Sequence, residues 1–582
     1  MSAPGSVYDA KKPPSKDDYE LDDLPEVTQG TVTPVGIPPR GDPEYEAKLA
    51  QLGLDPNSEH GAVQRNLKER HLAMIAIGGT IGTGLFVGSG TALAQGGPVG
   101  VWLSYIIMGT GVYAVMVALG ELCTLFPVPG AITHMATRFV DPAMGFALGY
   151  NYWYSWAITT PVELSAIAIV ISYWDPDQKI HPAVWIAIFF VLVCAINFLG
   201  VKWYGESEFI GSTIKVLAII GLIILGIVID LGGGPNGDRI GFRYWIDPGP
   251  FNSATTHQGE QVIGGSLGHF LAFFSTFITS AFSFIGTEIV AVTVGEARNP
   301  RRAVPRAIRR VFFRIVTFYI LGIFVISLIV PYNDPRLLSD TGNAASSPFT
   351  IAVSNAGIKV LPSIVNAIVL VAAWSAANSD VYAASRTLLA LSLEGKAPKI
   401  FRKCTPGGLP IYATALTASL GLLAFMGTST GTAGTVFNWL YNLSASTGLI
   451  AWVVILGSYL RFYYGLKKQG IDRRDFPFVA PMQPYLSWYG FIFFLIVIFF
   501  SGYTVFLEGN WSTSDFFSYY LSVIIFPIVY FGWKITKRTR WIRLNEMDFM
   551  TGRRELDEID AFEQERAATK TGPWNKFLSI LF

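Results

Sequence analysis

Long apolar stretches separated by short polar segments dominate the pattern of this chain. Each stretch holds about 20 residues with almost no charge, and as a helix such a stretch spans the hydrocarbon core of a bilayer. Because a helix closes its own backbone hydrogen bonds, we expect an all-α integral membrane protein with twelve transmembrane helices. The apolar runs fall near residues 72–94, 99–121, 144–173, 183–203, 209–231, 270–294, 311–331, 351–376, 411–427, 436–460, 488–507 and 514–533.

Composition supports the bilayer as the surrounding medium. Hydrophobic residues make up 51% of the 582 residues and charged residues only 15%, whereas a soluble protein usually has about a quarter charged. The formal net charge is +1, so the charge balance gives no sign of a nucleic-acid partner. The lipid bilayer is the expected partner.

Basic residues between the runs predict the orientation. Connections after even-numbered runs are rich in Lys and Arg and the others are poor in them, which places both termini in the cytoplasm. The expected organisation is a disordered cytoplasmic N-terminal tail over 1–66, a transporter domain over 67–535 and a cytoplasmic C-terminal tail over 536–582. The basic residues include Arg298, Arg301, Arg302, Lys396, Lys399, Arg473, Arg474, Lys534 and Lys537.

The polar start of the chain has no early apolar core and does not resemble a signal peptide. We expect the first apolar helix to act as an uncleaved targeting signal. The three cysteines, Cys123, Cys194 and Cys404, fall towards the predicted cytoplasmic side, so we expect no disulfide framework. The histidines lack metal-ligand spacing, and we expect neither a metal site nor a cofactor. Asn510 begins a glycosylation acceptor triplet.

Two apolar runs carry interruptions typical of broken helices. Run one contains four glycines within Gly78–Gly84, and run six contains Gly286 next to Glu288. Irregular backbone is tolerated at membrane depth only inside protein or beside a wet cavity. Paired interruptions in corresponding places indicate the binding site of a transporter.

The chemistry of these interruptions suits a zwitterion. Where helix one resumes, the amides of Thr83, Gly84 and Leu85 would favour a carboxylate, and Gly82 and Gly84 would let a ligand approach the main chain. Carbonyls of residues 282–285 would accept bonds from an ammonium group. Phe282 or Phe284 would cover the aliphatic part. Alternatively, the glycines only permit close helix packing. The predicted substrate-binding residues are Gly82, Thr83, Gly84, Leu85, Phe282, Ser283, Phe284 and Gly286.

Several motifs together resemble the amino-acid permeases of the amino acid–polyamine–organocation superfamily, in its fungal plasma-membrane branch. The resemblance covers residues 66 to about 545. It implies that helices one to five and six to ten form a 5+5 inverted repeat, with two helices added. The motifs are GGTIGTGLF (78–86), GELCTLFP (120–127), FSFIGTE (282–288), GEARNPRRAVP (295–305), WSAANSDVYAASR (374–386) and GKAPKI (395–400).

The activity implied by this resemblance is proton-coupled import of L-amino acids across the plasma membrane, by a carrier and not an enzyme. The segment 232–245 is similar to dicarboxylic amino-acid carriers, whereas Pro161–Leu164 is similar to members of broader range. We expect a broad range, and acidic, neutral and proline substrates all stay open. The resemblance also implies ubiquitin-ligase machinery as a partner of the tails, with Lys11, Lys12 and Lys16 as acceptors.

Ionisable residues inside apolar runs are usually functional. The candidates for proton coupling are Lys215, Glu163 and Glu288. In bacterial relatives a helix-five lysine occupies the place of a sodium ion, and Lys215 is similar in position; alternatively it extends to the cytoplasmic face. Each glutamate is a substrate contact, a protonation site or a carboxyl fixed by neighbours. We expect Glu121 to contact an Arg or Lys.

Three other functions predict different sequences. A non-transporting sensor of the same fold usually has a longer N-terminal extension, so the tail favours a carrier. A membrane-embedded enzyme needs a nucleophile with its base or paired histidines, and no such cluster stands out. An ion channel needs a uniform pore lining instead of two broken helices.

Overall fold

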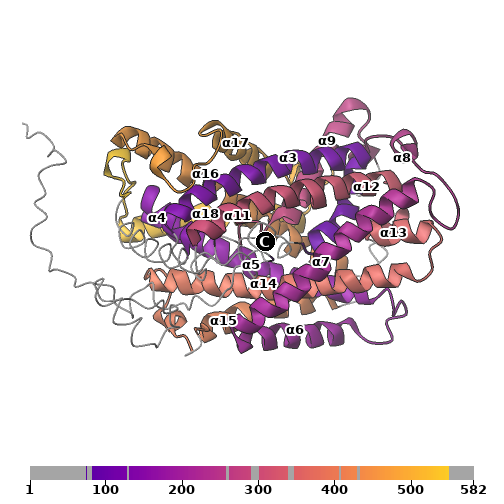
Figure 1. Cartoon of the computed structure of the whole chain (residues 1–582), viewed down its shortest axis with the longest axis horizontal. Coiled ribbons are helices and arrows are strands. Elements are labelled where there is room, and N and C mark those ends of the chain that lie inside the picture. Colours follow the sequence, from indigo (N-terminus) through magenta and orange to yellow (C-terminus); the bar gives the residue numbers. More distant parts are fainter. Residues whose placement is uncertain are drawn as a thin grey trace, which may run out of the picture.

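Over the residues that it describes, the computed structural model is a helical bundle with one short strand pair (Figure 1). It describes residues 74, 81–126, 130–256, 261–289, 291, 300–337, 347–405, 408–428 and 433–549. The main helices are η2 (Gly84–Gly88), α3 (Ser89–Leu125), α4 (Ala131–Phe139), α5 (Pro142–Ile171), α6 (Pro182–Leu199), α7 (Val201–Asp230), α9 (Gly265–Phe284), α11 (Pro300–Arg314), η5 (Ile315–Ile320), α12 (Leu321–Ile329), α13 (Pro348–Asn355), α14 (Leu361–Leu393), α15 (Ile411–Ser419), η9 (Leu420–Thr428), α16 (Ala433–Gln469), α17 (Tyr485–Phe500) and α18 (Thr513–Lys537).

Short elements complete the connections between these helices. The antiparallel pair β1–β2 joins Thr255 to Val262 and Thr256 to Gln261. Together with α8 it lies in the long connection between α7 and α9. The short elements are α8 (Arg243–Ile246), β1 (Thr255–Thr256), β2 (Gln261–Val262), η6 (Pro335–Leu337), η8 (Lys399–Arg402), η10 (Arg473–Asp475), η11 (Tyr503–Phe506) and η12 (Leu544–Glu546).

Ten helices within the described ranges are long and apolar enough to cross a membrane. One of them, Gly84–Leu125, is bent at Gly97, whose φ of 73° and following Pro98 separate the first two predicted runs. Run eleven corresponds to the shorter apolar helix Tyr485–Phe500. The count of twelve spans and the inverted repeat stay predictions.

The predicted bounds of run eight are wrong. Residues 351–376 do not form one helix, because the chain turns at Gly357 (φ 77°) between α13 and α14. Pro362 then lies at the start of α14, where its missing N–H costs no helical bond. Run five is also too short, since α7 starts at Val201 and not at residue 209.

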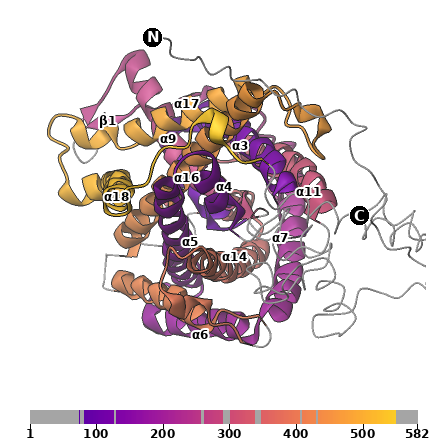
Figure 2. The same ribbon diagram turned by 90° about the vertical axis from the view of Figure 1, so that its left-hand side faces the viewer.

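The long helices run along the molecule and surround a packed centre. Figure 2 looks along many of their axes, with α5 and α14 inside, α6 below them and α18 at the left margin. Helix α5 packs along both α14 and α16, and α3 packs along α9. The interrupted parts of the chain therefore lie in the packed centre, where Thr83 meets Glu163 of α5 and Glu288 meets Trp452 of α16.

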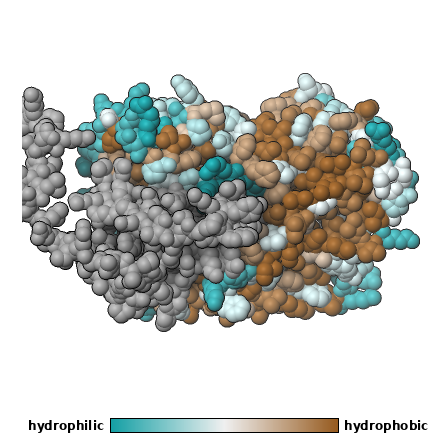
Figure 3. Space-filling model, in the orientation of Figure 1, coloured by the Kyte–Doolittle hydropathy of each residue, from teal (hydrophilic) through white to brown (hydrophobic). Residues whose placement is uncertain are grey.

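The outer surface is apolar where a bilayer would contact it. Figure 3 shows a broad hydrophobic area over the right half of this face and hydrophilic residues at the right-hand end. Large apolar side chains are exposed on several outer helices, and Leu217 of α7, Val191 of α6 and Ile528 of α18 are each more than 60% exposed. Water would make such exposure costly, whereas lipid tails would not.

Residues 538–549 fall in the predicted C-terminal tail but pack against the bundle. Met547 and Phe549 are buried, and the ring of Phe549 stacks on Phe139 of α4 with centroids 5.6 Å apart. Arg138 of α4 forms an ion pair with Asp548 at 3.1 Å. These contacts attach the segment to α4 and α16.

Candidate functional site

Thr83 joins the start of the first described helix to a buried carboxylate. Thr83 is the N-cap of η2, so the amides of Gly84 and Leu85 lie in the first turn of η2. The Thr83 hydroxyl donates a 3.0 Å bond to Oε1 of Glu163 on α5, and both residues are buried. This bond links the predicted carboxylate site to one predicted coupling residue.

Gly84 lies directly against the end of α9. A Cβ atom on Gly84 would come within 2.7 Å of the Ser283 Cα and 3.0 Å of the Phe282 ring. The Ser283 hydroxyl donates a 2.7 Å bond to the Gly84 carbonyl and also bonds Tyr105 of α3. A Cβ atom on Gly82 would meet Glu163 at 2.9 Å. In this conformation both glycines permit close helix packing, which the sequence alone offered as the alternative to ligand binding.

The break in run six begins later than expected. Residues 282–284 belong to α9, and the Phe282 carbonyl already accepts a bond from the Ile285 amide. The helix ends at Phe284, and Gly286 adopts a φ of 89° that favours glycine. The expectation of unwound carbonyls over 282–284 is therefore wrong, and the irregular backbone covers residues 285–288.

The two candidate phenylalanines point to different neighbours. The Phe282 ring lies 3.9 Å from the Tyr441 ring of α16, beside Gly84. Phe284 is completely buried and stacks on Tyr319 with centroids 4.4 Å apart. Of the two, Phe282 borders the first helix break and Phe284 fills the packing behind α9.

Lys215 forms a buried ion pair with Glu208. Its Nζ lies 3.2 Å from Glu208 Oε1, and the side chains are 0% and 1% exposed. The alternative that Lys215 extends to water is wrong for this conformation. Glu208 also accepts bonds from Ser212 at 2.7 Å and from Ser375 of α14 at 2.6 Å. Ser375 thus contacts the partner of the lysine, whereas Asn378 accepts a bond from Asn197 of α6.

Glu288 belongs to a second buried cluster. Its Oε2 accepts a 3.1 Å bond from the Trp452 indole of α16. The neighbouring Thr287 accepts a 2.8 Å bond from Arg314, which is also fully buried. The irregular segment after α9 is therefore held by α16 on one side and by the end of α11 on the other.

Two buried carboxyl groups that interact with Lys215 were not predicted. Glu208 lies in α7, and Asp380 lies in α14 with 4% exposure. Asp380 interacts electrostatically with Glu163, Lys215 and Glu208. The signal was present in the sequence, because Glu208 precedes Lys215 by two helical turns and Asp380 lies in the WSAANSDVYAASR motif.

Glu121 has the structural contact that the sequence predicted. It accepts bonds from Arg473 Nε at 2.8 Å and Nη2 at 2.6 Å. Tyr459 and the Ala480 amide donate to the same carboxylate. A bidentate arginine fixes both distance and angle, so Glu121 fastens the end of α3 to α16 and the following loop.

None of the three cysteines forms a disulfide.

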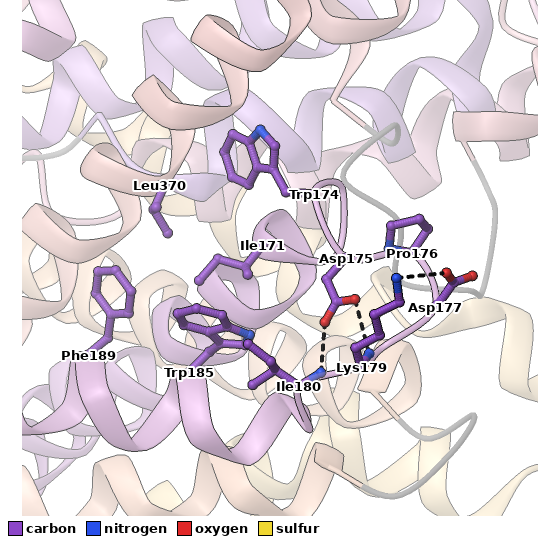
Figure 4. A pocket seen from close by; sticks show the side chains of 10 residues that line it. All are labelled: Ile171, Trp174, Asp175, Pro176, Asp177, Lys179, Ile180, Trp185, Phe189 and Leu370. Carbon is purple, nitrogen blue, oxygen red and sulfur yellow. Dashed lines mark hydrogen bonds and ion pairs between the residues drawn. The ribbon is translucent and has the colours of Figure 1, made fainter.

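A surface pocket of about 550 Å³ lies away from these residues. Figure 4 shows its apolar wall, including Trp174, Trp185 and Phe189, and the loop where Asp175 accepts bonds from backbone amides. Ile171 of the pocket lies two turns beyond Glu163 on α5, about 12 Å along the helix. The pocket is therefore separate from the interrupted helices.

Comparison with known proteins gives a consistent family. The model described as "Amino acid permease" matches residues 71–546. The chain is 47% identical to the lysine-specific permease of Saccharomyces cerevisiae, over 88% of this chain and 83% of that protein. It is 42% identical to the dicarboxylic amino acid permease of the same yeast, over 91% and 88%. It is 44% identical to the proline-specific permease of Emericella nidulans, over 87% and 92%.

Proposed function

Because the chain belongs to the amino acid permease family, we propose that it is a proton-coupled symporter that imports L-amino acids across the plasma membrane. It is a multi-pass membrane carrier of amino acids and not an enzyme. The proposal includes twelve spans in a 5+5 inverted repeat with two added helices, and both termini in the cytoplasm. The observation that supports coupling best is the bond from Thr83 to Glu163, since it puts the predicted carboxylate site next to an ionisable group.

The proposed substrate site lies between η2 and the end of α9. The substrate carboxylate binds the amides of Gly84 and Leu85, where the helix dipole favours negative charge. Phe282 covers the aliphatic part, and carbonyls near Gly286 accept bonds from the ammonium group. Because Gly84 touches Ser283 here, binding requires the two segments to separate. The transport cycle supplies that separation.

Proton coupling is assigned to Lys215, Glu163 and Glu288. All three are buried in the bundle and lie beside the interrupted segments or one helix away. Accumulating a solute requires an ion whose binding shifts the balance between outward- and inward-facing states. A proton on Glu163 would change its bond with Thr83 and hence the substrate site, whereas Glu288 would act through the irregular segment that follows α9.

We propose a broad substrate range. The relatives named above carry the words lysine, dicarboxylic amino acid and proline in their names, so family membership alone does not select one class. A carrier restricted to acidic amino acids or to proline is the alternative within this function. The sequence left acidic, neutral and proline substrates open but did not include lysine, so the substrate test must include lysine.

A competition panel tests import and range. Cells without their own amino-acid carriers express the protein and take up one labelled amino acid against an excess of each common amino acid. Competition by basic, acidic and neutral substrates supports a broad carrier, and competition by one class supports a narrow one. Correct surface expression without uptake of any label would instead indicate a sensor and refute import.

A further inference from the structure

We propose that Glu208 is the fixed counter-ion of Lys215, and that this pair, together with its contact to α14, sets the proton coupling of uptake. The proposal rests on the proton-coupled import proposed above and assigns a positioning residue to it. Glu208 contacts neither η2 nor α9 among the described contacts, so it acts through the lysine.

The geometry of the pair makes Glu208 a counter-ion at a fixed distance. Glu208 and Lys215 are seven residues apart on α7, so they lie on one face and move together. Their charged atoms are 3.2 Å apart without exposure to solvent. Removing one partner of a buried pair leaves an uncompensated charge, which is far more costly than removing both.

Ser375 makes the pair sensitive to helix movement. It donates a 2.6 Å bond to Glu208 Oε2 from α14, and a Cβ atom on Gly211 would lie 2.6 Å from its oxygen. In the proposed repeat α7 belongs to the first half and α14 to the second. If the halves move apart, Glu208 keeps Lys215 but loses Ser375. The Glu208 carboxylate then accepts one hydrogen bond fewer. Because that bond stabilises its charged form, the proton affinity of the Glu208–Lys215 pair changes.

The other ionisable groups facing the pair can exchange that proton. Glu163 of α5 and Asp380 of α14 both interact electrostatically with Lys215. Each has one buried carboxyl oxygen without a hydrogen-bond partner in the described part of the chain, Glu163 Oε2 and Asp380 Oδ2. The helices α6, α12 and α13 also pack near α7 and carry no charged residue.

Charge counting supports proton sharing within this cluster. Three carboxylates and one ammonium would carry a net charge of −2 inside the bundle, and uncompensated charge at membrane depth is costly. Protons on the carboxyl groups remove that excess. The cluster therefore combines a fixed ion pair with two further carboxyl groups, of which Glu163 accepts a bond from Thr83 beside the proposed substrate site.

The test compares Glu208→Gln, Lys215→Met and the double variant E208Q/K215M with the wild type. Uptake is measured at external pH 5 and pH 7, together with exchange of internal for external substrate. We expect E208Q to reduce concentrative uptake at pH 5 at least tenfold and to make uptake independent of external pH. Exchange of internal for external substrate should persist. The double variant should lose no more than K215M alone, because Glu208 acts through the lysine.

Glu508→Gln is the control, since it makes the same change at an exposed glutamate in the connection before α18, away from the pair. It should keep the wild-type pH profile. Ser375→Ala keeps both charges of the pair and should shift the pH profile without abolishing uptake. A wild-type profile in E208Q, or losses that multiply in the double variant, would overturn the proposal.

Thermal stability of the purified protein provides a readout that does not depend on coupling. E208Q and K215M should each lower the melting temperature, and the double variant should recover most of the loss. If E208Q fails to reach the membrane, surface expression of E208Q, K215M and the double variant is compared instead, and the double variant should again recover most of the loss. No recovery would reject the counter-ion role, whereas a wild type whose uptake ignores the proton gradient would reject the proposed function instead.

Discussion

Gly84 is the residue at which the two interrupted segments approach most closely. A side chain there meets backbone atoms of Ser283, which cannot move aside as a flexible side chain could. We expect Gly84→Val to reduce uptake at least tenfold while the protein still reaches the cell surface, because the substitution separates η2 from α9 and blocks the main chain. The measurement is initial uptake rate normalised to surface protein.

The matched control for this substitution is Gly221→Val. Gly221 lies within α7, and a Cβ atom there has no heavy atom within 4 Å. Gly221→Val should retain nearly wild-type uptake. The comparison separates the effect of position 84 from the general cost of a β-branched residue in a helix. Normal transport by Gly84→Val would show that the assigned site at the first helix is wrong.

Some buried ionisable residues could be predicted from the sequence and others could not, for one physical reason. Glu163 and Lys215 stood out because they interrupt apolar runs, and both are buried. Glu208 lay outside run five, since the polar residues before position 209 resemble a loop. Asp380 lay beyond the predicted end of run eight. Glu208 is buried because Ser212, Lys215 and Ser375 bond its carboxylate, and hydropathy does not register such partners.

Asp141 connects two elements, the start of α5 and the end of α18. Its carboxylate accepts bonds from the Ala143 amide at 2.8 Å and the Thr539 hydroxyl at 2.6 Å, and it pairs with Lys534. Burial alone would raise the pKa of Asp141, but the bonds from Lys534, Thr539 and the Ala143 amide together hold it below its usual value. We expect Asp141→Asn to lower the free energy of unfolding by about 1–3 kcal/mol at pH 7.

The pH dependence of this effect has a definite sign. A carboxyl whose pKa is lower in the folded protein stabilises it above the unfolded pKa of about 4, and the contribution fades as pH falls further. The melting temperatures of wild type and Asp141→Asn in detergent should therefore converge from pH 7 towards pH 3. Asp177→Asn, in an exposed pair with Lys179 at 3.8 Å, should change little at either pH. A constant difference for Asp141→Asn would contradict this assignment.

The N-terminal tail lies outside the described residues, so its prediction depends on sequence alone. Replacing Lys11, Lys12 and Lys16 by Arg keeps their charge but removes the amines that ubiquitin requires. We expect internalisation triggered by substrate to slow, as measured by the loss of a surface label after amino acid is added. Unchanged internalisation would exclude these lysines as the main acceptors.

The types of the elements were easier to predict than their ends. Apolar runs of about 20 residues fix the helical class, because only helices and closed β-barrels satisfy the backbone in lipid and a barrel strand needs only about ten residues. The ends depend on local turns, such as Gly357 between α13 and α14 and Gly286 after α9. Those glycines were visible, but tertiary packing decides which of the many glycines ends a helix.

In the whole molecule, we expect Lys215 to link substrate movement to proton movement. Lys215→Met should lose accumulation against a gradient but keep exchange, because η2 and α9 retain the proposed substrate contacts. The check is the steady-state ratio of internal to external substrate alongside exchange rate. Since K215M leaves Glu208 without its counter-ion, E208Q/K215M should be measured beside it. Proton-driven accumulation in both would move coupling to Glu163 or Glu288.

The most direct test of the central claim uses the purified protein in sealed vesicles without other carriers. An inward proton gradient is imposed, and entry of a labelled amino acid chosen from the competition panel is followed with an internal pH dye. We expect the labelled amino acid to accumulate while the vesicle interior acidifies. A protonophore should abolish both, and replacing sodium by potassium at equal concentration should change neither. Accumulation that requires sodium and survives the protonophore would contradict the claim.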